Sequence, residues 1–185
     1  MMAEDTAAEA PTEVVLRRAE REDVDAIAAI EQVSFPTPWS RSLLASEVRQ
    51  ADSIYLVATI RGRVVGFVGM WHVMGEGHIC TLAVAPEHRG QGLGELLVLG
   101  ALDAAVEVGA DAVHLEYRVG NEAAAELYGK LDFQRVGRRP RYYSDTGEDA
   151  ILARINGLCE PEGSARLDRA WKRWERERSL RLVRE

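Results

Sequence analysis

The residues in this sequence that are best placed to do chemistry are the glycines of Arg89-Gly90-Gln91-Gly92-Leu93-Gly94. The segment stands between an expected strand and an expected helix. Glycines let the backbone come within hydrogen-bonding distance of a bulky anion, and the free N–H groups at the helix start then point at it, aided by the helix dipole. A diphosphate is the natural ligand. Glycines in such turns are also often purely structural, so the loop alone leaves both interpretations open.

Two other phosphate loops do not fit. A P-loop needs Gly-Lys followed by Ser or Thr, which the sequence lacks. A dinucleotide fold places its glycines on the first strand of a βαβ unit with an acid downstream. Here the glycines follow an antiparallel meander, which is the wrong context.

The elements that position this loop follow from the hydrophobic pattern. Strands are expected at 13–18, 54–60, 64–73, 78–84, 112–117, 133–143 and 149–155, and helices at 22–33, from Ser40 to about 49, from Leu93 to Ala104 and at 121–131. The three strands between 54 and 84 are joined by short turns, at Arg61-Gly62-Arg63 and Gly75-Glu76-Gly77, and form a meander. The order predicts an α/β (α+β) fold with a mixed, mostly antiparallel sheet and helices on both faces.

The chain divides into one large unit and terminal additions. Residues 1–12 are acidic and alanine-rich, resemble no secretory signal, and are expected to be a disordered leader. Residues 13–156 form the predicted domain and 157–163 a linker. Residues 164–185 are expected to be a basic, amphipathic helical extension.

The glycine loop and its surroundings resemble the GCN5-related N-acetyltransferase (GNAT) superfamily. Its pyrophosphate signature, Arg/Gln-x-x-Gly-x-Gly/Ala, is matched at Arg89, Gly92 and Gly94, and 81–86 resembles the strand that carries the acetyl group. Within the superfamily the RimI family, which acetylates the N-terminal alanine of a small-subunit ribosomal protein, is the most similar. That likeness covers roughly residues 13–155 and rests on Pro38-Trp39-Ser40, Leu115-Glu116-Tyr117-Arg118, Asn121, Ala125, Leu127-Tyr128, Phe133, Tyr142-Tyr143 and Gly147-Glu148-Asp149-Ala150.

Two positions depart from the family pattern, and one segment has no counterpart in it. Tyr117 replaces a small aliphatic residue and could reshape the acceptor pocket. Leu131-Asp132-Phe133 replaces Leu-Gly-Phe. The typical family member has nothing to match the extension after Gly157.

The resemblance implies the chemistry of two residues. An acetyl transfer from a thioester to an amine needs a base for the amine proton, donors for the oxyanion and an acid for the departing thiolate. Glu116 matches the family's base and Tyr128 its general acid. From periodicity alone, Glu116 reads as a solvated strand acid, and Tyr128 as an aromatic side chain packed against the sheet.

The resemblance also implies where acetyl-CoA binds. Backbone groups of Leu82, Ala83 and Val84 should hold the acetyl carbonyl and the pantetheine arm. The pyrophosphate should lie on Gly90, Gln91, Gly92, Leu93, Gly94 and Glu95, beside Arg89. Asn121 should bond the pantetheine region, although it can equally cap its helix.

The acceptor site is expected to be a peptide groove lined by Pro36, Trp39 and Tyr142. The same residues could instead form a hydrophobic plug over the sheet edge. The acceptor would be the N-terminal segment of a protein, and the RimI resemblance implies a ribosomal one. No metal is expected, because Cys80 and Cys159 lack metal-ligand spacing.

The composition, the charge and the cysteine usage narrow the classes of function. No apolar run reaches the ~18 residues of a membrane span, and the two cysteines indicate a reducing cytoplasm. The net charge of −7 argues against a protein whose whole surface binds nucleic acid. Residues 164–185 carry eight Arg or Lys against four Asp or Glu, so +4, which leaves −11 for residues 1–163. An acidic body suits a basic substrate, although many acidic proteins are merely soluble.

The basic extension has two interpretations. Leu167, Trp171 and Trp174 share one helical face and could dock the helix on the domain or on a second subunit. The arginines could instead guide the enzyme to ribosomal RNA or an acidic region of the substrate, which is the less favoured interpretation.

Two rival functions remain open. An acetyltransferase for lysine side chains or small amines would carry the same motifs. A CoA-binding sensor without catalysis is disfavoured because both Glu116 and Tyr128 are present.

Overall fold

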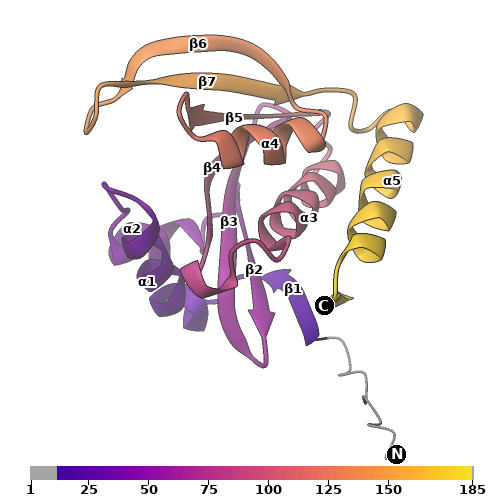
Figure 1. The fold of residues 1–185 in the computed structure, drawn as a ribbon, viewed down its shortest axis with the longest axis horizontal. Helices are drawn as coiled ribbons and strands as arrows, with labels where there is room; N and C mark the ends of the chain where they lie inside the picture. The colour runs from indigo at the N-terminus through magenta and orange to yellow at the C-terminus, as the bar shows by residue number, and fades with distance from the viewer. Residues whose placement is uncertain (1–11, 185) are drawn as a thin grey trace, which may run out of the picture.

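The computed structural model of the chain describes residues 12–184, and it places one mixed sheet between two layers of helices (Figure 1). The predicted leader lies outside the described residues except for Thr12, which begins the first strand. The elements in chain order are β1 (Thr12–Arg18), η1 (Arg21–Asp23), α1 (Val24–Ser34), α2 (Arg41–Glu47), β2 (Ser53–Ile60), β3 (Arg63–Val73), β4 (Glu76–Val84), η2 (Pro86–His88), α3 (Leu93–Glu107), β5 (Ala112–Arg118), α4 (Glu122–Lys130), β6 (Gln134–Tyr143), β7 (Glu148–Ile155), α5 (Pro161–Glu177) and β8 (Leu180–Arg184).

The eight strands of the described chain form one sheet in the order β6-β7-β5-β4-β3-β2-β1-β8. Strands β1 to β4 pair antiparallel, as the predicted meander requires, and β5 pairs antiparallel with β7. Only β4–β5 and β1–β8 are parallel. The predicted fold class, a mostly antiparallel mixed sheet with helices on both faces, is confirmed.

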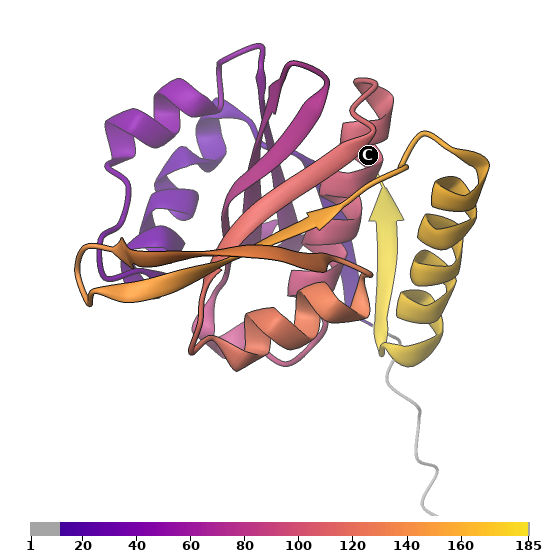
Figure 2. The ribbon, with the colours of Figure 1, turned by 90° about the horizontal axis from the view of Figure 1, so that it is seen from above.

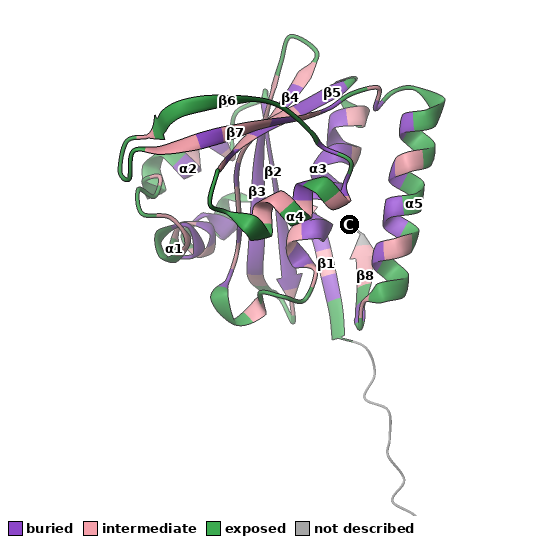
Figure 3. Cartoon of the chain, turned by 45° about the horizontal axis from the view of Figure 1, so that its top comes forward, coloured by how far each residue is buried: buried purple, intermediate pink, exposed green. Residues whose placement is uncertain are grey.

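Each face of the sheet has its own apolar core. On one face, Val24 and Ile27 of α1 pack with Tyr55 and Phe67 of the meander. On the other, α3 is nearly apolar all round, because it is covered by the sheet on one side and by α5 on the other (Figure 3). Burying each large side chain contributes roughly 1.5–3 kcal/mol, so the cores on both faces stabilise the sheet.

The sheet opens between its two central strands. The register of β4 with β5 runs only from Glu76↔Ala112 to Ile79↔Leu115. A β-bulge at Cys80, opposite Gly69 and Met70, bends β4 at this point. Beyond the bulge β5 follows β7 while β4 continues beside β3, and Figure 1 shows the two strands running apart.

The C-terminal extension differs from the predicted one at both ends. Helix α5 starts at Pro161, within the predicted linker, because proline fits the first turn of a helix. It ends at Glu177, and the chain then returns as β8, which pairs parallel with β1 from Thr12↔Leu180 to Leu16↔Arg184 (Figure 2). Leu180 is buried between the exposed Ser179 and Arg181, a strand-like alternation that a helical interpretation of 164–185 overlooks.

One predicted turn also lies elsewhere. The turn between β3 and β4 consists of Met74 and Gly75, both with positive φ, whereas Glu76 and Gly77 belong to β4. A Cβ at Gly77 would meet Val113 and Met70 within 3 Å. That glycine is therefore present for close packing, and its turn-like appearance in the sequence is misleading.

Candidate active site

The opening between β4 and β5 leads into a cavity of about 380 Å³. It is surrounded by α1 and the α1–α2 loop, β4, β5, α4 and the end of β6. It is lined by Glu31, Ser34, Phe35, Pro36, Thr37, Trp39, Ile79, Cys80, Thr81, Leu82, Glu116, Tyr117, Arg118, Asn121, Ala124, Tyr128 and Tyr143. Of the predicted site residues, Pro36, Trp39, Leu82, Glu116, Asn121 and Tyr128 meet here.

Glu116 is a partly enclosed carboxylate. It is therefore not the solvated strand acid that the alternation of polar and apolar residues suggests. Its side chain is only 9% exposed and accepts a hydrogen bond from Nε2 of His78 at 2.7 Å. The Arg139 guanidinium lies 3.1 Å from its other oxygen. The hydrogen bond from His78 and the charges of His78 and Arg139 hold the pKa of Glu116 below its usual value, although burial acts in the opposite direction. Glu116 is therefore ionised at neutral pH and can accept a proton.

His78 does not line the cavity but is the hydrogen-bond partner of Glu116, and the sequence pattern did not predict that role. It stands opposite His114 in the parallel register, and their rings stack at 4.3 Å. Its other side meets the edge of Trp71, which stacks on Trp39. Polar residues alternate with apolar ones in both β4 and β5, which indicates that His78 and Glu116 lie on a polar face of their strands. Only the parallel pairing of these strands brings His78 to Glu116.

Tyr128 reaches the cavity from the opposite side of the sheet. Its ring packs near Tyr117 and Phe133, each at 5.6 Å between centroids, and belongs to the α3-side core. Burial raises the pKa of Tyr128 well above its usual value, so the phenol keeps its proton. Tyr117, the residue that departs from the family pattern, lines the same wall.

Glu31 holds the loop that forms the acceptor side of the cavity. It is 2% exposed and accepts hydrogen bonds from the Trp39 backbone and the Thr81 hydroxyl, each at 3.1 Å. Burial raises the pKa of Glu31 in spite of these bonds. The sequence offered one indication of this role, because Glu31 is an acidic residue on the apolar face of α1, seven residues after Val24.

Strand β4 offers an edge to a ligand. Its pairing with β5 stops at Ile79, so the β5-facing edge from Cys80 to Val84 has no ladder partner among the described residues. Buried backbone groups need partners, and an extended ligand in the cavity would supply them. Asn121 caps α4 by accepting from the Ala124 backbone at 3.0 Å, so the capping interpretation is confirmed.

The glycine loop lines a second cavity of about 380 Å³ on the α3 face. Val84, Arg89, Gly90, Gly92, Leu93, Gly94 and Glu95 contribute to its wall, with Lys130 of α4 and Arg178 from the C-terminal extension. Gly92 caps α3 with a φ of 85°, the left-handed region that favours glycine. Residues of β4 and α4 line both cavities, so the two cavities lie against the same strand and the same helix.

Several predicted residues lie away from these walls. Gln91 lines a different hollow of about 890 Å³ near the start of β8. The methyl group of Ala83 packs in the α1-side core, which leaves its backbone for ligand contact. Tyr142 is 45% exposed and lies against Tyr143, which lines the cavity in its place.

Two kinds of feature are absent from residues 12–184. No three His, Cys, Asp or Glu side chains gather there as metal ligands would. No helix in that range is long and apolar enough to cross a membrane.

Comparison with known proteins gives one consistent result. A profile of the acetyltransferase (GNAT) family matches residues 24–133. A Bacillus subtilis protein named putative [ribosomal protein bS18]-alanine N-acetyltransferase is 38% identical over 142 residues, covering 76% of this chain and 94% of that protein. The N-alpha-acetyltransferase RimI of Mycobacterium tuberculosis is 34% identical over 140 residues, covering 72% of this chain and 87% of that protein.

The fold is similar to solved structures as well. The crystal structure of the ribosomal-protein-S18-alanine N-acetyltransferase from Escherichia coli superposes with a TM-score of 0.72 at 30% identity. The match covers 78% of this chain and 94% of that one.

Proposed function

Since the chain belongs to the acetyltransferase (GNAT) family and is an acetyl-CoA-dependent N-acetyltransferase, we propose that its acceptor is the α-amino group of an N-terminal alanine on a small-subunit ribosomal protein. The names of the relatives from Bacillus subtilis and Escherichia coli support this choice of acceptor. The structural observation that carries the proposal is the opening between β4 and β5, which has different chemistry on its two sides.

The two sides suit two different substrates. Glu116 and Trp39 line the cavity, and Trp39 packs on the core covered by α1 and α2, where a peptide would enter. His78 lies between Glu116 and Trp71, which stacks on Trp39. Tyr128 belongs to the α3-side core, and the glycine-loop cavity is lined by residues of the same helix, α4. The amine and the thioester would therefore meet inside the gap in the sheet.

Glu116 acts as the base in this proposal, directly or through a water molecule. An α-amino group has a pKa near ~7.7–8.0, against ~10.4 for lysine, so the proton to be removed is a modest burden at neutral pH. The partners of Glu116 keep the carboxylate ionised and fix its direction. Tyr128 keeps its proton and donates it to the departing sulfur.

The residues present fit acetyl-CoA. The unpaired edge of β4, which includes Leu82, Ala83 and Val84, would bond the pantetheine arm and the acetyl carbonyl. The Gly90–Gly94 loop at the start of α3 would hold the pyrophosphate. Asn121 stands at the cavity wall, where an amide can still bond the cofactor while it caps α4.

A peptide panel tests the acceptor. Short peptides that differ only in their first residue are incubated with acetyl-CoA, and the release of CoA and the mass of the modified fragment are measured. Alanine in first position is expected to react fastest, followed by other small residues. The matched control is the same alanine peptide with its N terminus already acetylated and an internal lysine present, which should be inert.

Acetylation of that lysine at a rate comparable to the free N terminus would place the protein among lysine acetyltransferases. If the acceptor is a ribosomal protein, the enzyme acts in the cytoplasm, which is also the location predicted from the cysteine usage. Fractionation of the native host with an antibody to the protein checks that location.

A further inference from the structure

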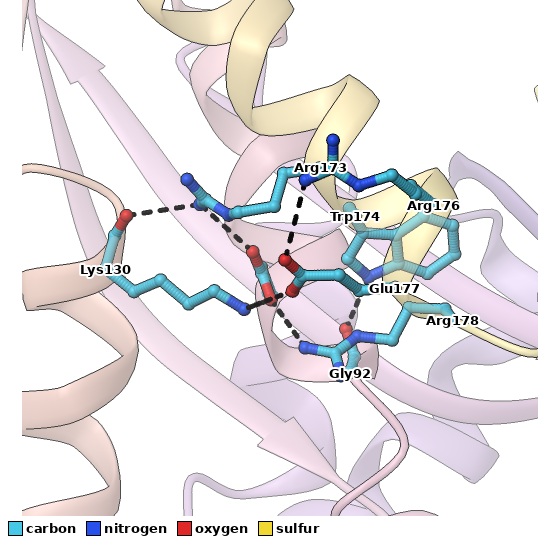
Figure 4. A network of polar contacts seen from close by, with 8 residues as sticks. Gly92, Lys130, Arg173, Trp174, Arg176, Glu177 and Arg178 are labelled. Carbon is cyan, nitrogen blue, oxygen red and sulfur yellow. Dashed lines mark hydrogen bonds and ion pairs between the residues drawn. The ribbon is translucent and has the colours of Figure 1, made fainter.

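The C-terminal extension reaches the glycine loop. Trp174 of α5 is completely buried, and its indole N–H donates to the carbonyl oxygen of Gly92 at 2.9 Å (Figure 4). Four residues later, Arg178 lies directly against Gly92, where a Cβ would meet its Nε at 2.3 Å. The side chain of Arg178 is part of the cavity wall beside Arg89 and Gly90.

A charge cluster fixes Arg178 in this position. Glu95, in the first turn of α3, is 3% exposed and pairs with Arg178 at 2.9 Å, with Lys130 at 2.9 Å and with Arg173 at 3.3 Å. Burial would raise the pKa of Glu95, but the hydrogen bonds from Lys130 and Arg178 hold it below its usual value. One buried carboxylate thus faces three cations, and Glu177, which pairs with Lys130 at 3.4 Å, supplies only one further negative charge.

We propose that Arg178 is a cofactor-binding residue, which the extension adds to the glycine loop to contact the pyrophosphate of acetyl-CoA. The inference rests on the proposed placement of the pyrophosphate at Gly90–Gly94, and it is independent of the identity of the acceptor.

Two observations and one general property of arginine carry the assignment. The cluster has an excess of positive charge beside the start of α3, where backbone N–H groups already favour an anion. The Nε of Arg178 is buried and has no hydrogen-bond partner among residues 12–184, and an unsatisfied buried donor is costly. A guanidinium also matches phosphate oxygens with two parallel donors.

The test measures affinity for three thioesters by calorimetry, without any acceptor. Arg178→Gln is compared with the wild type for acetyl-CoA, acetyl-dephospho-CoA and S-acetyl-pantetheine, which lacks all phosphates. Affinity for the first two is expected to fall by roughly ten-fold, the range of a lost charge-assisted hydrogen bond. Affinity for S-acetyl-pantetheine should not change.

Two matched controls exclude indirect effects. Arg173→Gln removes another partner of Glu95 from the same helix, but Arg173 is not part of the cavity wall. Arg176→Gln removes an equal charge whose side chain is 78% exposed. Arg176→Gln should retain acetyl-CoA affinity to within about two-fold. Arg173→Gln lowers the charge of the cluster without removing a residue of the cavity wall, so it should lose less affinity than Arg178→Gln.

Each remaining result overturns the proposal. An equal loss for S-acetyl-pantetheine would mean that Arg178 only shapes the pocket, and tighter binding would mean that it blocks the loop. A loss seen with acetyl-CoA but absent with acetyl-dephospho-CoA would assign the contact to the 3′-phosphate. Unchanged affinity for all three would leave Arg178 with no role in binding.

A separate variant tests the placement of the pyrophosphate itself. Gly94→Asp adds a negative charge in the first turn of α3, where the new Cβ would meet only Leu127 at 3.5 Å. Acidic residues suit that position of a helix, so the fold should survive while acetyl-CoA affinity falls by more than ten-fold. If Gly94→Asp binds normally, the placement is wrong; if only Arg178→Gln binds normally, the placement stands and the role of Arg178 falls.

Discussion

At the scale of single residues, the neighbours of Glu116 and Tyr128 set the protonation states of these two groups in the cavity. The carboxylate of Glu116 is held by His78 and Arg139 from two sides. The phenol of Tyr128 lies among aromatic rings and loses access to water. One group is therefore kept ionised and the other kept protonated, which is the division that an amine acetylation needs.

Replacing Glu116 by Gln should lower turnover by roughly 10²–10⁴-fold at neutral pH, the usual effect of losing a general base. Because the pKa of Glu116 is lowered, the wild type keeps its base throughout the neutral range. The deficit should therefore shrink as the pH rises through the amine pKa of ~7.7–8.0, since more of the acceptor is already neutral.

The measurement is turnover against pH on the alanine peptide. Glu76→Gln is the matched control, because Glu76 pairs with Arg154 outside the cavity, and its turnover should stay near that of the wild type. Wild-type turnover by the Glu116→Gln enzyme at neutral pH would refute the assignment.

Tyr128→Phe should lower kcat by roughly 10²–10⁴-fold, as expected for a lost general acid, and leave the peptide KM nearly unchanged. The reason is that its hydroxyl acts on the departing thiolate. Tyr143→Phe is the sharpest comparison, because Tyr143 lines the same cavity, burial raises its pKa to about 12, and Arg118 lies 4.0 Å above its ring.

Steady-state kinetics on both variants separates the two phenols. If Tyr143→Phe loses turnover and Tyr128→Phe does not, the acid is Tyr143. If Tyr128→Phe raises only the peptide KM, Tyr128 is a binding residue.

The candidate residues that the sequence predicts differ in kind from those that only the structure suggests. Glu116 and Tyr128 were predicted through a family resemblance, because periodicity alone described an ordinary strand acid and a packed aromatic. His78, Glu31 and Arg178 depend on contacts between segments distant in the chain, such as the 50 residues between Glu31 and Thr81. Local patterns carry no information about such pairs.

At the scale of elements, the order of strands and helices through β7 was predicted, and the two features that make the site were not. The opening of the sheet depends on the bulge at Cys80, and nothing in the local sequence distinguishes that residue from a regular strand position. The end of the extension was predicted as helix because Leu167, Trp171 and Trp174 set a helical period, which the chain abandons after Glu177.

Ending the chain after Arg178 tests the extension as an element. The shortened protein loses β8, including the buried Leu180, but keeps α5 and Arg178. Burial of one leucine contributes roughly 1.5–3 kcal/mol, so the free energy of unfolding should fall by at least about that much. Acetyl-CoA affinity should stay the same.

Ending the chain after Gly163 should be far more damaging. It removes Trp171 and Trp174 and exposes the apolar side of α3 that they cover; loss of a single buried tryptophan side chain costs about 3–5 kcal/mol. Denaturant unfolding followed by tryptophan fluorescence measures both truncations. Equal stability of all three proteins would mean that the extension is a passive appendage.

At the scale of the whole molecule, the charge is divided between an acidic body and a basic extension. Part of the positive charge of the extension is paired with the acidic body, because Arg173 and Arg178 form ion pairs with Glu95 of the domain. The apolar side of α5 faces α3. Docking of the extension, one of its two sequence interpretations, therefore accounts for both its tryptophans and two of its arginines.

The outward-facing cations decide whether the extension also guides the acceptor. Arg169, Lys172 and Arg176 are exposed on α5 and take no part in the described cavities. Replacing all three by Glu changes the net charge by six units, from −7 to −13, without touching the docked face. Because these side chains are exposed and lie away from the docked face of α5, the variant should fold normally and keep its turnover on short peptides.

The decisive quantity is the ratio of turnover on a full-length ribosomal acceptor to turnover on its N-terminal peptide, measured between about 50 and 200 mM salt. Electrostatic guidance releases counterions, so its contribution would weaken steeply over that range. We expect the same ratio and the same salt dependence for the variant and the wild type. A lower and less salt-sensitive ratio in the variant would instead show that the exposed face of α5 attracts the acceptor or the RNA beside it, and docking would then be only half of its role.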